Sequence, residues 1–118
     1  MITYQSKLTQ ARLARLALVM LERFPQVVTG YLLDVRIECG CAVGFIYRDL
    51  GRYRDGDLIT SSDIVELQCY GRRWLIKTRG YACYAVVDFH PRGGRKSLLH
   101  LADLFESAAW ARSNCMVH

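Results

Sequence analysis

The longest run of alternating apolar and polar residues in this chain extends from Leu58 to Phe89. Alternation with a period of two is typical of β-strands that have one buried face. Two short segments, Gly71-Arg72 and Arg79-Gly80, divide the run, and glycine readily takes the positive φ angles of two-residue hairpin turns. The pattern therefore predicts a meander of three antiparallel strands that ends the sheet, between Ile64 and Phe89.

The two turns also predict which residues face one another. The pairs are Cys69 with Trp74, Leu67 with Ile76 and Val65 with Thr78 about the first turn, and Ile76 with Cys83 and Trp74 with Ala85 about the second. A shift by one residue would turn every apolar side chain to the other face. The predicted buried face consists of Val65, Leu67, Cys69, Trp74, Ile76, Tyr81, Cys83, Ala85, Val87 and Phe89.

Two helices are predicted to flank the sheet. Residues Ser6 to Phe24 contain no glycine or proline, and Pro25 ends the segment. Its predicted core face consists of Leu13, Ala14, Leu16, Ala17, Met20, Leu21 and Phe24, and Arg12, Arg15 and Arg23 lie on the other face with Leu8 and Val19. That second face is either solvated or a surface for a partner. A C-terminal helix is predicted from an N-cap at Ser97, with an apolar stripe of Leu98, Leu101, Ala102, Phe105, Ala108 and Ala109, and the segment from Ser113 to the end is expected to fray.

The segment between the first helix and the meander is rich in β-branched and aromatic residues. It predicts strands near Tyr31 to Glu38 and Cys41 to Tyr47, joined at Gly40. A short helix over Tyr31 to Ile37 is an alternative, because the alternation there is loose. The charged, glycine-containing segment from Arg48 to Asp57 is predicted to be a surface loop.

These elements predict a single α+β domain over residues 1–118. We expect an antiparallel sheet of about five strands in a two-layer arrangement, with both helices on its apolar face. A chain of 118 residues is long enough to bury a core without disulfides or metals. No segment resembles a secretory leader or a membrane-spanning helix, so a cytoplasmic protein that does not act at a membrane is expected.

The chain has five cysteines, which is typical of a reducing compartment rather than of a disulfide framework. Cys39 and Cys41 form a C-x-C pair that could offer two thiolates to a metal ion. No second pair or suitably spaced histidine accompanies them. We therefore expect small buried side chains beside a glycine turn, and no metal or other cofactor.

The net charge of +5 is distributed unevenly along the chain. From Arg72 to Lys96, seven basic residues accompany one acidic residue, Asp88. From Asp34 to Glu66, seven acidic residues accompany four arginines. Such asymmetry indicates a basic surface that faces a polyanion or an acidic protein.

Two segments are candidates for that surface. The basic segment His90 to Lys96 precedes the last helix, whose N-terminus favours anions, but it lacks the glycine spacing of a nucleotide-hydrolysing P-loop. The outer face of the meander combines cations with tyrosines, a mixture that can bind single-stranded nucleic acid. The candidate partner-binding residues are Arg72, Arg73, Lys77, Arg79, Tyr84, Arg92, Arg95 and Lys96. No catalytic residue is assigned, because His90, His100 and His118 belong to no recognisable catalytic motif.

The segment Asp55 to Val86 resembles a β-module of small proteins from phages and other mobile elements. The shared features are Asp55-Gly56, the stretch Ser61 to Val65, and Thr78 followed by Tyr81 or Tyr84. The resemblance covers about a quarter of the chain, and Ser61-Ser62 replaces the Thr-Ser of the module. Such proteins include inhibitors of host defence, among them anti-CRISPR proteins, and the resemblance implies action by binding rather than by catalysis.

Two functions follow as expectations. The first is a non-enzymatic accessory or inhibitor protein that binds a protein or ribonucleoprotein partner through its basic surface. The alternative is a nucleic-acid-binding protein that uses Arg73, Lys77, Tyr84 and the segment Arg92 to Lys96.

Overall fold

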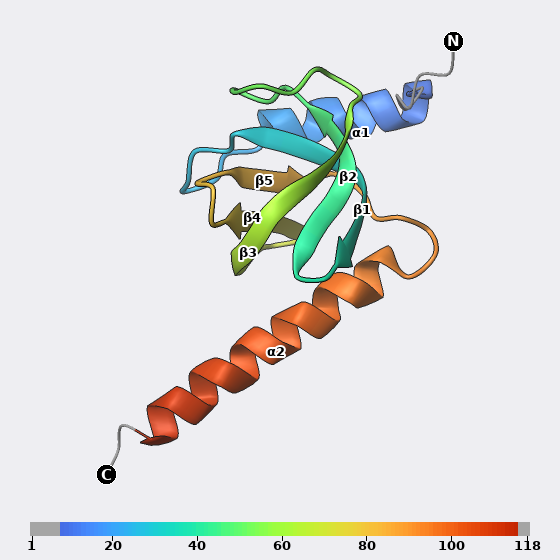
Figure 1. Cartoon of the computed structure of the whole chain (residues 1–118). Helices are drawn as coiled ribbons and strands as arrows, with labels where there is room; N and C mark the ends of the chain where they lie inside the picture. The colour runs from blue at the N-terminus through green and yellow to red at the C-terminus, as the bar shows by residue number, and fades with distance from the viewer. Residues whose placement is uncertain (1–7, 116–118) are drawn as a thin grey trace.

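The computed structural model describes residues 8–115, of which residues 110–115 are described by their backbone alone. In this part of the chain, five strands lie between two helices (Figure 1). The elements are α1 (Gln10–Leu21), β1 (Gly30–Glu38), β2 (Cys41–Tyr47), β3 (Leu58–Tyr70), β4 (Arg73–Thr78), β5 (Cys83–Val86) and α2 (Gly94–Cys115). The predicted α+β class is confirmed.

The five strands form a closed barrel, so the predicted two-layer arrangement of an antiparallel sheet is wrong. Each strand pairs antiparallel with the next one along the chain. Because the number of strands is odd, the first and the last run in the same direction, and β1 pairs in parallel with β5. Closure gives both edge strands a hydrogen-bonding partner, which an open sheet would leave unpaired.

The predicted strands at 31–38 and 41–47 are confirmed over the helical alternative, with β1 beginning one residue earlier, at Gly30. Strands β1 and β2 form a hairpin in which Glu38 pairs with Cys41. Cys39 and Gly40 connect them with φ angles of 51° and 76°. Two consecutive positive φ angles are the mark of a type I′ turn, whose twist matches that of the strands it joins.

The long strand β3 curves around the barrel with the help of a bulge. About the turn at Gly71, Cys69 pairs with Trp74 and Leu67 with Ile76, as predicted. The register then shifts between Ile64 and Glu66, which leaves one extra residue, Val65, in β3. A bulge bends its strand and increases the twist. Its extra residue, Val65, is exposed rather than buried as predicted.

The predicted pairing about the second turn is wrong by one residue. Strand β4 ends at Thr78 and β5 begins at Cys83, so a loop of four residues rather than a turn of two connects them. Within this loop, Tyr81 has a φ angle of 66° and donates its backbone N–H to the carbonyl of Thr78 at 3.1 Å. The longer loop pairs Ile76 with Tyr84. Tyr84 therefore points into the barrel, and Cys83 points out of it.

Both faces of the barrel wall carry an apolar core. The interior core consists of Leu32, Val35, Ala42, Ile46, Ile59, Ile64, Ile76, Tyr84, Val86 and Leu98. The outer core lies beneath α1 and consists of Leu16, Val19, Leu33, Tyr47, Leu75, Cys83, Ala85 and Val87. All four residues of β5 are buried for this reason. The two helices therefore pack against different cores, and the prediction of one shared apolar face is wrong.

The face by which α1 packs on the barrel differs from the predicted one. Leu16 and Val19 are its buried residues. Leu13, Met20 and Leu21, which were predicted to be in the core, are 53%, 39% and 80% exposed. The helix begins at Gln10 and ends at Leu21, before the predicted Phe24, and the predicted start at Ser6 lies outside the described residues.

An ion-pair network explains the orientation of α1. The Nη2 atom of Arg12 lies 3.0 Å from Asp34 Oδ1 and 3.2 Å from Asp88 Oδ1, and its Nε donates to Asp88 Oδ2 at 3.3 Å. Asp88 also accepts the backbone N–H of Asp34 at 2.6 Å. Desolvation opposes the charge of Arg12, but the two carboxylates outweigh it and raise the pKa of the guanidinium. The arginine face, predicted to be solvent-exposed or partner-binding, thus turns toward the barrel at Arg12.

Helix α2 begins at Gly94, earlier than the predicted N-cap at Ser97. A Cβ atom on Gly94 would lie 2.3 Å from the carbonyl oxygen of Val35, so only glycine allows the helix to start this close to β1. The Ser97 hydroxyl accepts the backbone N–H of Ile37 at 2.8 Å and donates to the carbonyl of Gly94 at 2.7 Å. Ser97 therefore attaches α2 to β1 instead of capping the helix.

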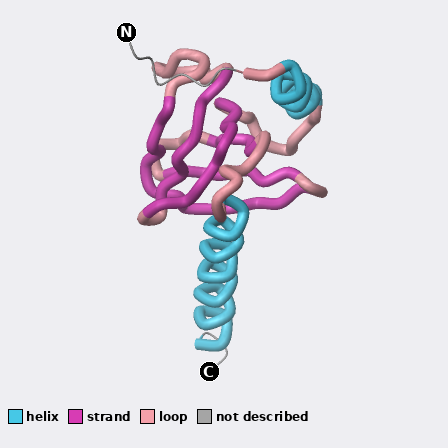
Figure 2. Tube along the Cα trace, turned by 90° about the vertical axis from the view of Figure 1, so that its right-hand side faces the viewer, coloured by secondary structure: helices cyan, strands magenta, loops and turns pink. Residues whose placement is uncertain are grey.

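Only the first half of α2 contributes to the core. Leu98 is fully buried in the barrel interior, and Leu101 and Phe105 pack against it. The rest of the predicted apolar stripe, Ala108 and Ala109, is exposed. Figures 1 and 2 show the helix running away from the barrel toward the C-terminus. The helix continues to residue 115, and residues 116–118 of the segment predicted to fray lie outside the described part.

Candidate functional site

The structure brings three of the eight predicted partner-binding residues together. Arg72, Arg73 and Arg95 line one groove of about 320 Å³, although 22 positions separate the last two in the sequence. The complete lining consists of Arg15, Arg72, Arg73, Trp74, Val86, Val87, Asp88, Phe89 and Arg95. We refer to this concavity as the arginine groove. Its walls come from α1, the start of β4, the segment after β5, and the start of α2.

The arginines of the groove differ in how strongly the protein already neutralises them. Arg73 donates from Nε to Glu22 Oε1 at 3.0 Å. Arg15 Nη1 lies 3.7 Å from Asp88 Oδ2. The guanidinium of Arg95 lies 4.7 Å from the ring centroid of Phe89, a cation–π contact that leaves its N–H donors free. Within the described residues, no carboxylate pairs with Arg72 or Arg95.

The remaining predicted residues lie elsewhere. Lys77 pairs with Glu66 at 3.1 Å, and Lys77 and Arg79 line a different hollow on the barrel. Arg92 and Lys96 are exposed near the start of α2. Because the helix begins at Gly94, the predicted basic loop is shorter than expected, and Lys96 belongs to the first turn of α2.

Tyr84 does not belong to the outer sheet face, so its predicted role beside Lys77 is wrong. The four-residue loop before β5 shifts the register by one residue and directs the Tyr84 ring into the barrel. The outward position next to it belongs to Ala85, which α1 covers. The predicted mixed cation and tyrosine surface on the meander therefore lacks Tyr84.

The outward side of α1 forms a second feature of this part of the surface. Its exposed apolar residues, which we call the apolar face of α1, are Leu13, Leu18, Met20 and Leu21. Leu18 is three positions after Arg15, a spacing that makes the two side chains neighbours on a helix. The apolar face of α1 therefore borders the arginine groove. The sequence shows Leu13, Met20 and Leu21 as apolar residues at helical spacing, but this pattern predicts that they face the core.

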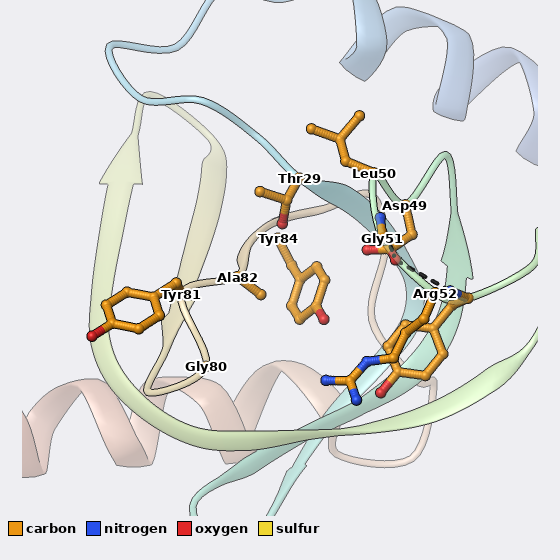
Figure 3. A pocket seen from close by; sticks show the side chains of 10 residues that line it. Thr29, Asp49, Leu50, Gly51, Arg52, Gly80, Tyr81, Ala82 and Tyr84 are labelled. Atoms are coloured by element: carbon orange, nitrogen blue, oxygen red, sulfur yellow. Dashed lines mark hydrogen bonds between the residues drawn. The ribbon is translucent and has the colours of Figure 1, made fainter.

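The open end of the barrel contains a further cleft, of about 490 Å³ (Figure 3). It lies where β1, β3 and β5 begin and where β2 and β4 end, whereas α2 covers the interior near Leu98. Its lining residues are Thr29, Asp49, Leu50, Gly51, Arg52, Tyr53, Gly80, Tyr81, Ala82 and Tyr84. We call it the barrel-mouth cleft. The sequence predicts Arg48 to Asp57 only as a surface loop, and the adjacent Arg52 and Tyr53 are the one feature in it that indicates a binding site.

The cysteines and histidines whose side chains the structure describes do not form one cluster. Cys41 lies 3.7 Å from Asp63 Oδ1, and burial, followed by the nearby Asp63 charge, raises the pKa of its thiol. His90 Nδ1 accepts the backbone N–H of Arg92 at 3.1 Å. Among the residues that the structure describes, no group of three or more histidine, cysteine or acidic side chains is arranged to hold a metal ion.

No helix within the described part of the chain has the length and hydropathy needed to cross a membrane. No family model, curated protein or solved structure matches this chain.

Proposed function

We propose that this chain is a non-enzymatic accessory or inhibitor protein that binds an acidic protein surface through the arginine groove and the apolar face of α1. The observation that carries the proposal is the adjacency of these two features. Arginine and large apolar side chains are enriched where protein interfaces form, and large exposed apolar patches are uncommon on monomers without a binding role.

The chemistry of the two features is complementary. Arg72 and Arg95 have free donors for carboxylates, and a guanidinium can bind a carboxylate through two parallel hydrogen bonds. The apolar face of α1 would supply the buried anchor, because desolvated apolar and aromatic contacts contribute most of the binding energy in such interfaces. A nucleic acid would leave these leucines in water.

The inhibitor role rests on the resemblance of Asp55 to Val86 to the phage and mobile-element module. In the structure this segment contains all of β3, β4 and β5, which are three of the five strands of the barrel wall. The arginine groove and α1 lie on or beside this wall. An inhibitor of this kind would act by occupying a surface of its partner.

Two double variants test the proposal. The full-length protein, tagged, is incubated with extract from its native host, and bound proteins are quantified by mass spectrometry. Arg72→Glu with Arg95→Glu, and separately Leu13→Gln with Leu21→Gln, are each expected to reduce recovery of the specific partner by at least tenfold. Both leucines are solvent-exposed and glutamine is a good helix former, so the second variant should fold.

The control is Arg54→Glu, which makes the same charge reversal at an exposed arginine outside the groove. It should recover the partner as the wild type does. If all variants recover the same proteins in the same amounts, neither feature is the interface.

A second function, binding of single-stranded nucleic acid, is favoured by one specific observation. The arginine groove contains Trp74 and Phe89 among its arginines. Aromatic rings stack on bases while arginines pair with phosphates. The groove therefore offers both contacts that a single strand requires.

Fluorescence anisotropy with labelled single-stranded DNA and RNA decides this alternative. Affinity should fall linearly with salt on a logarithmic scale, with a slope of about −0.7 for each phosphate contacted. Arg72→Glu with Arg95→Glu should flatten that slope by roughly 1.4 if each arginine contacts one phosphate. An absence of binding at low salt excludes the alternative and leaves the protein-partner proposal intact.

A further inference from the structure

The barrel-mouth cleft contains a buried polar group that has no protein partner. Tyr84 is only 5% exposed, and its ring lines the cleft. In the described part of the chain, the Tyr84 hydroxyl forms no hydrogen bond. Every fully buried side-chain nitrogen or oxygen in that part does have a hydrogen-bond partner. The hydroxyl oxygen must therefore reach the open space of the cleft. Figure 3 shows the Tyr84 ring in the middle of the cleft.

The Tyr84 hydroxyl is a hydrogen-bond donor at neutral pH. Burial, and then the nearby charge of Asp49, raise the pKa of Tyr84 to about 12. Both effects disfavour the phenolate. The protonated hydroxyl can therefore donate a hydrogen bond to an acceptor oxygen or nitrogen of a ligand.

Arg52 supplies a positive charge at the edge of the same cleft. Its guanidinium lies 5.6 Å from the ring centroid of Tyr53, and no carboxylate in the described residues forms a salt bridge with it. The nearest acidic residue of the lining, Asp49, instead accepts the backbone N–H groups of Gly51 at 3.1 Å and Tyr53 at 3.3 Å. Asp49 thus shapes the loop, and Arg52 remains available to an anion (Figure 3).

The other polar groups of the cleft are already paired. The Thr29 hydroxyl accepts the backbone N–H of Cys83 at 3.0 Å and donates to the carbonyl of Cys83 at 3.3 Å. The backbone N–H of Ala82 donates to the Thr78 hydroxyl at 3.3 Å. Among the side chains of the lining, the donors left for a ligand are the guanidinium of Arg52 and the phenol hydroxyls, and Asp49 is the acidic group beside them.

An aromatic rim completes the cleft. Tyr81, which was predicted to be buried, is 95% exposed at the tip of the β4–β5 loop, and its φ angle of 66° is rare for a bulky residue. A strained backbone position that presents a ring to solvent at a cleft is a feature that points to function. Tyr53 and Tyr84 also line the cleft, and Figure 3 shows the Tyr81 ring at its edge, directed away from Tyr84.

We propose that the barrel-mouth cleft binds a small anion that carries a planar ring, with the anionic group on Arg52, an acceptor atom on the Tyr84 hydroxyl, and the ring against Tyr81. Nucleoside monophosphates are the chemical class that combines these three elements. Such a nucleotide could be free or could form the 5′ end of a strand. The site is separate from the arginine groove and does not depend on the function proposed for it.

The test uses the four ribonucleoside 5′-monophosphates as probes, with isothermal titration calorimetry for affinity and ¹⁵N–¹H NMR for location. Binding should be detected at up to millimolar concentrations, and amide shifts should be largest at residues 49–53 and 80–84. Inorganic phosphate and the nucleosides each lack half of the ligand and should bind at least tenfold more weakly. A 5′-phosphorylated oligonucleotide that binds more tightly than every monophosphate would identify a strand end as the source, and the reverse order would identify free nucleotides.

Three variants decide whether the named contacts are responsible. Tyr84→Phe keeps the ring in the core but removes the hydroxyl, and Arg52→Gln removes the charge; each should weaken binding about tenfold. The matched control is Arg54→Gln, in the same loop but outside the cleft, which should bind as the wild type does. The proposal is overturned if no monophosphate binds, if phosphate alone binds as well, or if Tyr84→Phe and Arg52→Gln have no effect.

Discussion

At the scale of single residues, Tyr84 shows how one step of register changes the chemistry available to a side chain. On the outer face it would be a solvated phenol next to Lys77. In the structure it pairs with Ile76 inside the barrel and has a pKa of about 12. The difference arises from the loop that ends at Ala82, which has two residues more than the predicted turn.

The raised pKa of Tyr84 predicts that the protein loses stability at alkaline pH. A tyrosine in the unfolded chain ionises near pH 10, whereas Tyr84 in the folded protein keeps its proton until about pH 12. Unfolding between these values releases a proton, so the free energy of unfolding falls as the pH rises. Between about pH 9 and 11 the wild type should lose about 1 kcal/mol more than Tyr84→Phe does.

Urea denaturation at several pH values measures this difference. At neutral pH the two proteins should be of similar stability, because the hydroxyl has no protein partner to lose. Tyr81→Phe, at an exposed position, should retain the wild-type pH profile. Parallel profiles for wild type and Tyr84→Phe would contradict the assignment of the buried phenol.

At the scale of elements, α1 is held by charge as well as by apolar contact. Leu16 and Val19 enter the outer core, and between them and the helix N-terminus Arg12 reaches Asp34 and Asp88. The same orientation turns the apolar face of α1 to solvent. The ion pairs of Arg12 therefore help to set which face of α1 is exposed, and the hydrophobic pattern of the helix alone does not predict that face.

Removing one carboxylate from this network should loosen α1. Asp88→Asn is expected to lower the free energy of unfolding by about 1–3 kcal/mol, since hydrogen bonds to charged groups contribute about this much. The control is Glu66→Gln, which breaks the more exposed pair with Lys77 and should cost less than about 1 kcal/mol. Chemical denaturation followed by circular dichroism compares them. Equal losses in the two variants would mean that the Asp88 network does not anchor the helix.

At the scale of the whole molecule, one wall of strands separates two cores. The interior core is closed by Leu98 of α2, and the outer core is closed by Leu16 of α1. Strands β4 and β5 contribute to both. The two cores should therefore unfold together, because neither can lose its packing without exposing the shared wall.

Truncation in either core tests this coupling. Leu16→Ala and Leu98→Ala are each expected to destabilise the protein by about 2–5 kcal/mol. Each variant should retain a single transition, seen at the same denaturant concentration by circular dichroism and by tryptophan fluorescence. Leu104→Ala, at an exposed position of α2, should change stability by no more than about 0.5 kcal/mol. Separate transitions for helix loss and barrel loss in Leu16→Ala would show that α1 is an independent unit.

Local patterns in the sequence were sufficient for the elements and for one hairpin register. Alternation and turn residues identified the strands at 31–38 and 41–47 and the pairing of Cys69 with Trp74, because these depend on neighbours in the chain. The uneven charge also located Arg72, Arg73 and Arg95, which the structure brings into one groove.

The remainder was decided by contacts between distant segments. Closure of the barrel depends on the pairing of β1 with β5, about 54 positions apart in the sequence, and no local pattern encodes it. Closure gives the wall two buried faces, so alternation could not identify which side was inside. The long-range pair of Arg12 with Asp88 likewise outweighed the amphipathic pattern of α1. Local patterns were therefore enough to place the strands, the helices and the basic segment. Which side chains are exposed and which line the cleft could not be predicted, because both depend on how the wall closes.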